Sequence, residues 1–417
     1  FGSSIFFFQP CLHQTLPGIF FALMRAWQAV SDISSPDSVL RVLQYNVLAD
    51  SLAKGCQAEL DPEIYTCPAH LLQPGSAGKH FFIESEGPCY TFRAPQRHLA
   101  WERRFPLILQ EVLKHCPDIM CLQEVDVDRF DDFDSALRAA GYEGLYCKKA
   151  WKTIKDGNAV FWRSAKLSLV NYEKFQFQRD SPMKALLVHL TTSWGVPVVV
   201  CSTHLKCGMD NEAMRLDHIH KLIQQLDAVA GDRVTVLCGD LNAHCSRFHW
   251  CNGRGCNDVE MLFEPKVVPA LVHAGFRSAY EGFTTFTCWN GWLDRDVKAT
   301  FDYIFIRGPV ETRSVLELHS EAYVSQFPER LPNQFCPSDH LSMVADLELC
   351  PRMETSMKQI ADQTPITVKL QKFGIRKVST PSLQKEPQVQ EEAATPAVRL
   401  LNAELEAALT LRIKQST

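Results

Sequence analysis

The 417-residue chain lacks an excess of basic residues, a regularly spaced cysteine framework and a long uninterrupted apolar run. Its formal net charge is −5, so bulk electrostatics do not favour nucleic acid, and a polyanion must be bound locally with the help of a metal ion. Residues 5–30 are apolar but interrupted, and no other stretch approaches the ~20 apolar residues of a membrane span. With 46% hydrophobic residues, the sequence predicts a globular protein with an ample core and no membrane span.

The 16 cysteines are scattered, which argues against a disulfide scaffold and favours a reducing compartment. Cys121, Cys201 and Cys238 lie in apolar runs, where small buried thiols are expected. We expect a cytoplasmic protein. A mitochondrial transit segment stays open as the alternative, although the N-terminal residues lack early basic charge.

One irregular segment is rich in cysteine and histidine. It contains Cys245, His249, Cys251 and Cys256, whose spacing, C-x3-H-x-C-x4-C, is not a common zinc pattern. We expect reduced thiols there. A structural zinc ion is the alternative, and the zinc content of the purified protein would test it.

Changes in composition predict four segments. Residues 1–36 form an N-terminal extension in which Met24 is the expected true start, and residues 37–351 form a globular domain. Residues 352–394 are polar and contain several prolines, as in a linker. Residues 395–417 have an apolar stripe at helical spacing, so the helix over 396–415 either docks onto the domain or binds a protein partner.

The hydrophobic periodicity predicts an α/β domain in which strand hairpins alternate with long helices. This order does not match the regular alternation of a doubly wound fold, and two packed mixed or antiparallel sheets flanked by helices fit better. Segments 54–97, 244–257 and 282–298 are expected to be loops. The predicted helices are 101–115, 130–140, 209–228 and 267–273. The predicted strands are 39–48, 118–123, 143–146, 158–162, 167–175, 184–190, 196–201, 234–238, 301–306, 310–318 and 341–349.

The run Val236–Ala243 reads as a buried strand that Gly239 ends, followed by Asp240 and Asn242 on the same side of the chain. Asp240 can take a proton from water, and the Asn242 amide can donate to an oxyanion on phosphorus. A strand followed by an ordinary Asn turn is the alternative.

Polar residues recur near the ends of the predicted strands, which is how an α/β scaffold gathers a site. Each has an ordinary structural explanation, but together they suit phosphoester hydrolysis. Carboxylate and amide oxygens favour Mg²⁺ or Mn²⁺ over zinc, and a His–Asp pair can orient an imidazole toward phosphate. The set is Asn46, Glu124, His204, Asp240, Asn242, Asp302, Asp339 and His340.

Six motifs occur in an order that resembles the exonuclease–endonuclease–phosphatase superfamily, in its deadenylase branch. The resemblance runs from about Val39 to Leu349, and segment 99–104 adds to it. The motifs are the segments 42–48, 121–126, 202–206, 238–243, 301–304 and 337–342. The resemblance implies a four-layer α/β sandwich.

The resemblance also implies roles at the matching positions. Glu124 would be the main Mg²⁺ ligand with Asn46 beside it, and Asp339 would support the metal side. Asp240 and Asn242 would align water and hold a phosphoryl oxygen. His204 would contact the phosphate, and Asp302 would orient His340.

Two enzymatic substrates follow from the resemblance. One is the poly(A) tail at an RNA 3′ end, shortened 3′ to 5′ to yield 5′-AMP, and the other is the 2′-phosphate of NADP(H). Lys206 and Arg215 match substrate-binding positions, whereas Gly208 replaces an arginine, which weakens the dinucleotide alternative.

Lys149 and Trp151 lie in a basic loop and are a candidate grip for a polyanion, with an ordinary solvated loop as the alternative. A third alternative is a catalytically idle adaptor that recruits partners through the C-terminal helix.

Overall fold

The computed structural model describes residues 25–31, 38–54, 81–83, 87–89, 92–251, 260–282, 286–291 and 296–350. These belong to one compact unit, Phe20–Pro351. The predicted linker 352–394, the predicted helix 395–417 and the question of the first 23 residues lie outside the described residues. Among the described helices, none has the length and apolar character needed to cross a membrane.

Two mixed sheets form the centre of the unit. The larger has seven strands in the order β1-β18-β19-β2-β5-β7-β6. Its strands are β1 (Trp27–Ala29), β2 (Val39–Asn46), β5 (Ile119–Asp126), β6 (Tyr142–Lys148), β7 (Asp156–Arg163), β18 (Val310–Leu316) and β19 (Met343–Leu349). The N-terminal extension predicted over 1–36 thus contributes β1, which pairs with β18.

The smaller sheet has six strands in the order β14-β17-β11-β10-β9-β8. They are β8 (Leu167–Gln176), β9 (Lys184–Thr192), β10 (Pro197–His204), β11 (Val234–Asp240), β14 (Arg277–Ser278) and β17 (Asp302–Arg307). Three two-stranded sheets complete the list: β3 (Phe81–Ile83) with β4 (Gly87–Cys89), β12 (Phe248–Cys251) with β13 (Glu260–Phe263), and β15 (Cys288–Gly291) with β16 (Asp296–Ala299).

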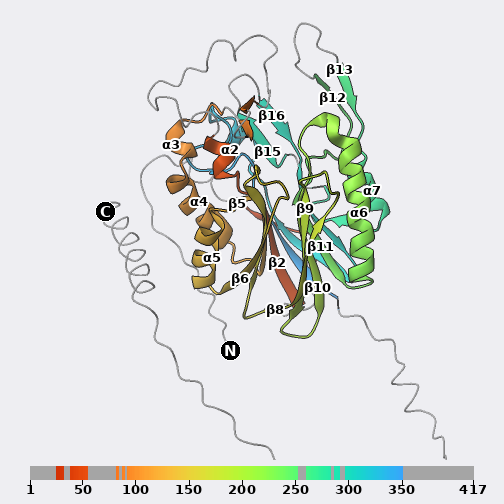
Figure 1. The fold of residues 1–417 in the computed structure, drawn as a ribbon. Helices are drawn as coiled ribbons and strands as arrows, with labels where there is room; N and C mark the ends of the chain where they lie inside the picture. Colours follow the sequence, from red (N-terminus) through yellow and green to blue (C-terminus); the bar gives the residue numbers. More distant parts are fainter. Residues whose placement is uncertain are drawn as a thin grey trace, which may run out of the picture. The chain divides into compact units, whose positions relative to one another are not determined.

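The helices lie outside the two sheets (Figure 1). Those on one side include α4 (Trp101–Leu113) and α5 (Phe130–Ala139), and those on the other are α6 (Glu212–Ala230) and α7 (Val267–His273). The short helices are α2 (Asp50–Lys54), α3 (Gln96–Leu99), α8 (Glu321–Val324) and the 3₁₀ turn η3 (Met209–Asn211).

Three apolar cores separate the four layers. Strand residues such as Val42 and Val236 pack between the sheets because alternate side chains of each strand face the partner sheet. Ile108 of α4 packs on the outer face of the larger sheet, and Leu222 of α6 packs on the outer face of the smaller one. The predicted four-layer sandwich is therefore confirmed.

Several local predictions were wrong. Gly239 does not end its strand, since β11 continues through Asp240. A Cβ at Gly239 would lie 2.3 Å from the carbonyl oxygen of Thr203, so glycine allows β10 and β11 to approach closely. The loops predicted over 244–257 and 282–298 contain β12 and the hairpin β15–β16, because their aromatic and β-branched residues support short strands.

Candidate active site

The carboxyl ends of four strands meet at one edge of the sandwich. β2 runs parallel to β5 and β10 runs parallel to β11, so the residues that end these strands share that edge. His204 and Asp240 are register partners at the ends of β10 and β11, and Asp302 lies opposite Asp240 at the start of β17. The sheet topology therefore assembles side chains that are far apart in sequence.

Glu124 lies at an irregularity in β5, where the pairing with β7 shifts register between Leu122 and Val125. Its backbone φ is 58°, a conformation that costs energy for a residue with a side chain. The bulge aims the carboxylate at the site, where it accepts hydrogen bonds from the Ala49 amide (3.0 Å) and from Asn46 Nδ2 (3.1 Å). Burial, together with the charges of Asp339 and Asp156, raises the pKa of Glu124 to about 8.

Asp240 lies at the centre of the site. Its Oδ2 accepts from Asn46 Nδ2 (2.9 Å), and its Oδ1 accepts from the Asn242 backbone amide (2.9 Å). The Nε2 atoms of His204 and His340 lie 3.6 and 3.7 Å from Oδ2. Burial raises the pKa of Asp240 to about 6, although His340 acts in the opposite direction.

The two histidines differ in charge. His340 Nδ1 lies 2.7 Å from Asp302 Oδ2, and although burial opposes the charged ring, Asp302 and the other site carboxylates raise the pKa of His340 well above 6.5. Burial lowers the pKa of His204, and the nearby cations Lys149 and Lys206 add to the effect. The surroundings therefore favour the charged form of His340 and the neutral form of His204.

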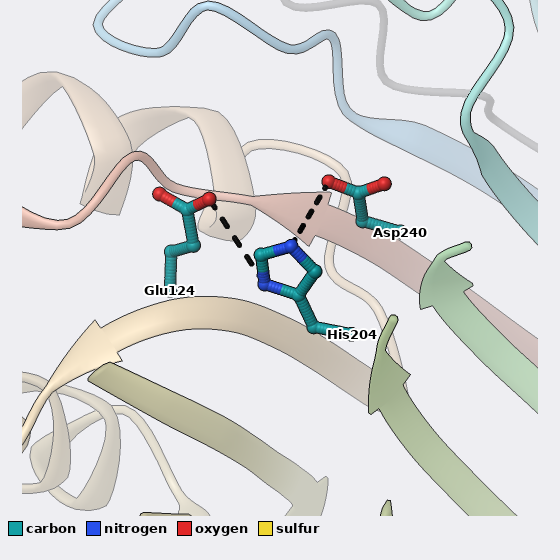
Figure 2. Close-up of side chains that lie close together, drawn as sticks. All are labelled: Glu124, His204 and Asp240. Carbon is teal, nitrogen blue, oxygen red and sulfur yellow. Dashed lines mark ion pairs between the residues drawn. The ribbon is translucent and has the colours of Figure 1, made fainter. Parts of the chain in front are cut away.

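His204 lies between Glu124 and Asp240, as Figure 2 shows. Its Nδ1 is 3.9 Å from Glu124 Oε1. Asn242 Nδ2 lies 3.1 Å from both His204 Nε2 and the Leu205 carbonyl oxygen, so this amide orients the ring. The backbone of Asn242 has a φ of 48°, which asparagine tolerates better than most residues.

Asp339 and His340 are held by the serine that precedes them. Ser338 Oγ donates to the carbonyl oxygen of Asn46 (2.6 Å) and accepts from the His340 amide (3.1 Å). Burial raises the pKa of Asp339, while His340 and Arg104 act against the shift. Ser338 thus ties the segment of Asp339 to the end of β2.

A buried amide pair beneath the site was missed at the sequence level. Gln44 and Gln123 exchange two side-chain hydrogen bonds of 2.7 and 2.8 Å across β2 and β5. Gln44 also donates to Asp302 (3.0 Å), and Gln123 donates to Ser202 Oγ (3.1 Å), which joins the two sheets. The available signal was a glutamine in each of two strands that otherwise read as apolar.

The donor set fits a hard divalent cation. Among the described residues, Glu124, His204 and Asp240 bring potential ligand atoms within 4.8 Å of one another, and so do Asp240, Asp302 and His340. Burial is the main cause of the raised pKa values of Glu124 and Asp339, and neighbouring carboxylates add to it; a divalent cation would offset both effects. Asn46 Oδ1 accepts from the Leu48 amide while its nitrogen faces the two carboxylates, and the use of Asn46 as a ligand stays a prediction.

Three of the four predicted substrate-binding residues have different surroundings. Lys206 is half-buried, and its ammonium has no ion-pair partner among the described residues. Lys149 is buried, pairs with Asp156 (2.6 Å) and lies 3.4 Å from His204 Nδ1. Trp151 is exposed in the turn after β6, and no contact with another described residue places it in the site.

Arg215 is bonded to groups of the protein itself. Its side chain is fully buried, pairs with Glu212 (2.9 Å) and donates to the carbonyl oxygens of Lys206 and Gly208. It therefore supports the loop that carries Lys206, and its direct contact with a substrate stays a prediction. The zinc alternative is untested, because Cys256 and the side chains of His249 and Cys251 lie outside the described residues.

Comparison with known proteins identifies relatives of this chain. Residues 89–340 match the sequence model of the Endonuclease/Exonuclease/phosphatase family. Rat nocturnin (Rattus norvegicus) is 27% identical over 339 residues, which cover 76% of this chain and 67% of nocturnin.

Two solved structures share the fold. The human nocturnin catalytic domain with bound sulfate has a TM-score of 0.53 and 24% identity, and the match covers 78% of this chain and 97% of that domain. ANGEL2, a 2′,3′-cyclic phosphatase in complex with adenosine-2′,3′-vanadate, has a TM-score of 0.57 and 18% identity, over 78% of this chain and 99% of ANGEL2. The match to the family model spans more than half of the chain, so this protein belongs to the endonuclease/exonuclease/phosphatase family and is a phosphoesterase.

Proposed function

We propose that this phosphoesterase depends on Mg²⁺ and shortens the poly(A) tail at RNA 3′ ends, releasing 5′-AMP. The observation that carries the proposal is Asp240, a buried carboxylate with a pKa of about 6 that lies against His204, His340 and the Asn242 amide. At neutral pH it is ionised and can accept a proton from water. Glu124 and Asp339, with Asp240, would hold the metal ion, which would neutralise charge on the phosphoryl oxygens.

The remaining residues stabilise the anionic phosphoryl group. His340, held by Asp302, presents Nε2 toward Asp240 as a protonated donor. A phosphoryl oxygen can compete with His204 for the Asn242 amide hydrogen, which gives Asn242 its proposed oxyanion role. Lys206 supplies a cation beyond the end of β10 that no acidic group among the described residues neutralises.

The proposal is tested with a 5′-labelled RNA that ends in about twenty adenosines. Wild-type protein with Mg²⁺ should shorten this RNA from its 3′ end and release AMP, and Glu124→Ala should be at least about 100-fold slower. Glu311→Ala is the matched control, because Glu311 is an exposed carboxylate paired with Arg277. An RNA that stays intact with the wild-type protein, or that Glu124→Ala shortens equally fast, contradicts the proposal.

The second candidate is hydrolysis of the 2′-phosphate of NADP(H). Lys206 favours it, since its ammonium acts on His204, has no ion pair among the described residues and suits a compact phosphate as well as a phosphodiester. Phosphate release from NADPH, measured beside the RNA assay in one preparation, decides between them. If phosphate is released from NADPH and the RNA is not shortened, NADP(H) hydrolysis replaces poly(A) shortening as the proposed function. If the RNA is shortened and no phosphate is released, NADP(H) hydrolysis is rejected.

The adaptor alternative conflicts with membership of an enzyme family and with the intact catalytic set. A partner-binding role for the helix predicted over 396–415 stays a prediction, because this segment lies outside the described residues.

A further inference from the structure

Arg104 of α4 is fully buried beside the site and touches neither of its catalytic histidines. Its Nη1 donates to the carbonyl oxygens of Val47 (3.1 Å), Leu48 (2.9 Å) and Pro337 (3.1 Å), and its Nε donates to Leu99 (3.0 Å). One nitrogen therefore joins two chain segments that are almost 300 residues apart in sequence.

Both segments lead directly to the acidic side of the site. In the first, Leu48 donates its amide to Asn46 Oδ1, and the next residue, Ala49, donates its amide to Glu124 Oε2. Leu48 has a φ of 57°, an unfavourable conformation that the bonds around it must hold in place. In the second segment, Pro337 precedes Ser338 and Asp339, and Ser338 bonds back to Asn46.

The charge of Arg104 matters as well as its hydrogen bonds. Among the described residues, no carboxylate pairs with Arg104 within 4 Å, and its Nη2 has no hydrogen-bond partner. The carboxylates that act on it through space include Asp50 and Asp339. A buried cation without a direct ion pair is costly unless nearby negative charge compensates it, and here Asp50 acts most strongly and Asp339 of the site comes next.

We propose that Arg104 is a positioning residue that sets the separation of Glu124 and Asp339 and so preorganises the pocket for its divalent cation. Its hydrogen bonds hold the Leu48 turn against the segment of Asp339, and its charge attracts the Asp339 carboxylate. This inference rests on the proposed use of Mg²⁺ at the site.

The test compares Arg104→Met, which removes every donor, with Arg104→Lys, which restores a cation and part of the bonding. Mg²⁺ affinity is measured by calorimetric titration of the folded protein, and kcat is measured on the RNA as Mg²⁺ is raised. Arg104→Met should weaken Mg²⁺ binding about tenfold or more, with kcat recovering at high Mg²⁺ and KM for RNA little changed. Arg104→Lys should lie between Arg104→Met and the wild type.

Arg41→Met is the control for a purely structural loss. Arg41 pairs with Asp346 (2.7 Å) at the opposite end of β2 from Asn46, so its replacement should lower Tm and leave Mg²⁺ affinity unchanged. If Arg104→Met lowers Tm in the same way without weakening Mg²⁺ binding, the inference is overturned while the proposed function stands. If the wild-type protein binds no Mg²⁺, the proposed metal dependence fails, and the inference fails with it.

A second variant covers the case in which Arg104→Met does not fold. Ser338→Ala removes the other bond between the same two segments and changes little volume. It should also weaken Mg²⁺ binding, by a smaller factor than Arg104→Met. An unchanged Mg²⁺ affinity in folded Ser338→Ala overturns the inference.

Discussion

The site has two halves of similar burial and different electrostatic balance. On the side of the seven-stranded sheet, Glu124 and Asp339 are crowded carboxylates, and the pKa of Glu124 rises to about 8. On the side of the six-stranded sheet, Asp240 lies against two imidazoles, and its pKa rises only to about 6. The negative charge of the first half needs a cation from solution to neutralise it. In the second half, imidazole groups of the chain itself lie against the carboxylate.

The two buried arginines show the same contrast. Arg215 of α6 pairs with Glu212 (2.9 Å) and supports the Lys206 loop as part of a neutralised pair. Arg104 of α4 has no such carboxylate among the described residues within 4 Å, and its charge acts on the acidic half. Each outer helix thus supports the half of the site next to its own sheet, and of these two arginines only Arg104 lacks a paired carboxylate among the described residues.

The largest effect is expected when the central carboxylate, Asp240, is replaced. Asp240→Asn should lower kcat by about 10³-fold or more, because it removes the proton acceptor and the charge that faces His204 and His340. Steady-state kinetics at saturating Mg²⁺ measure this effect, with Asp346→Asn as a control far from the site. A loss of less than tenfold would mean that Asp240 is not the base.

The second effect concerns the acidic half and its pH dependence. Glu124→Gln should weaken Mg²⁺ binding by roughly a hundredfold. In the wild type, Glu124 must lose a proton before it can bind a cation, so the Mg²⁺ Kd should rise by about tenfold per pH unit as pH falls below about 8.

Glu124→Gln should lose the part of this pH dependence that lies between about pH 7 and pH 8, and Glu311→Gln should retain it. A wild-type Mg²⁺ Kd that does not vary with pH would contradict the raised pKa of Glu124. In the metal-free protein, the free energy of unfolding varies with pH in the opposite direction: it falls as pH rises, whereas Mg²⁺ binding strengthens. A carboxyl group whose folded pKa is raised stabilises the fold at low pH, and this contribution disappears as pH rises toward about 8.

A smaller effect, on KM for RNA, is expected from replacing Lys206. Lys206→Ala should raise KM for RNA about tenfold and leave Mg²⁺ affinity unchanged, because it removes one phosphate contact and no metal ligand. Arg215→Lys should raise KM by a smaller factor by loosening the Lys206 loop. A change in Mg²⁺ affinity in either variant would show that the two halves are not separable.

The smallest effect on catalysis is expected from the amide pair between the halves. Gln123→Leu removes both hydrogen bonds to Gln44 and the bond to Ser202, so it should destabilise the fold by about 1–3 kcal/mol. Denaturant unfolding measures this loss, and kcat should change by less than tenfold. A fall in kcat comparable to that of Asp240→Asn would indicate that the pair transmits geometry between the halves.

Much of the fold followed from the sequence, because apolar periodicity is a local property. The helix over 101–115 and the strand over 310–318 were predicted close to their observed bounds. The strands around Gly239 and within 244–257 were not, because close approach to Thr203 and pairing between β12 and β13 depend on distant backbone.

The candidate site divides in the same way. The ordered motifs identified Glu124, Asp240 and His340, since strand ends that carry polar residues can be recognised in the sequence itself. Neither the bulge that gives Glu124 a φ of 58° nor the buried roles of Arg104 and Arg215 could be read there. An arginine in an amphipathic helix has the same local pattern whether it faces solvent or a row of carbonyl oxygens.

The sequence by itself determined the class of fold, the family and the chemical types in the site, because these depend on residue identity and order along one chain. Only the tertiary structure decided how charge is shared between the two halves and which cations support each one. The physical reason is that a pKa or an ion pair depends on separations of a few ångströms between side chains tens to hundreds of residues apart, which strand register and helix packing set.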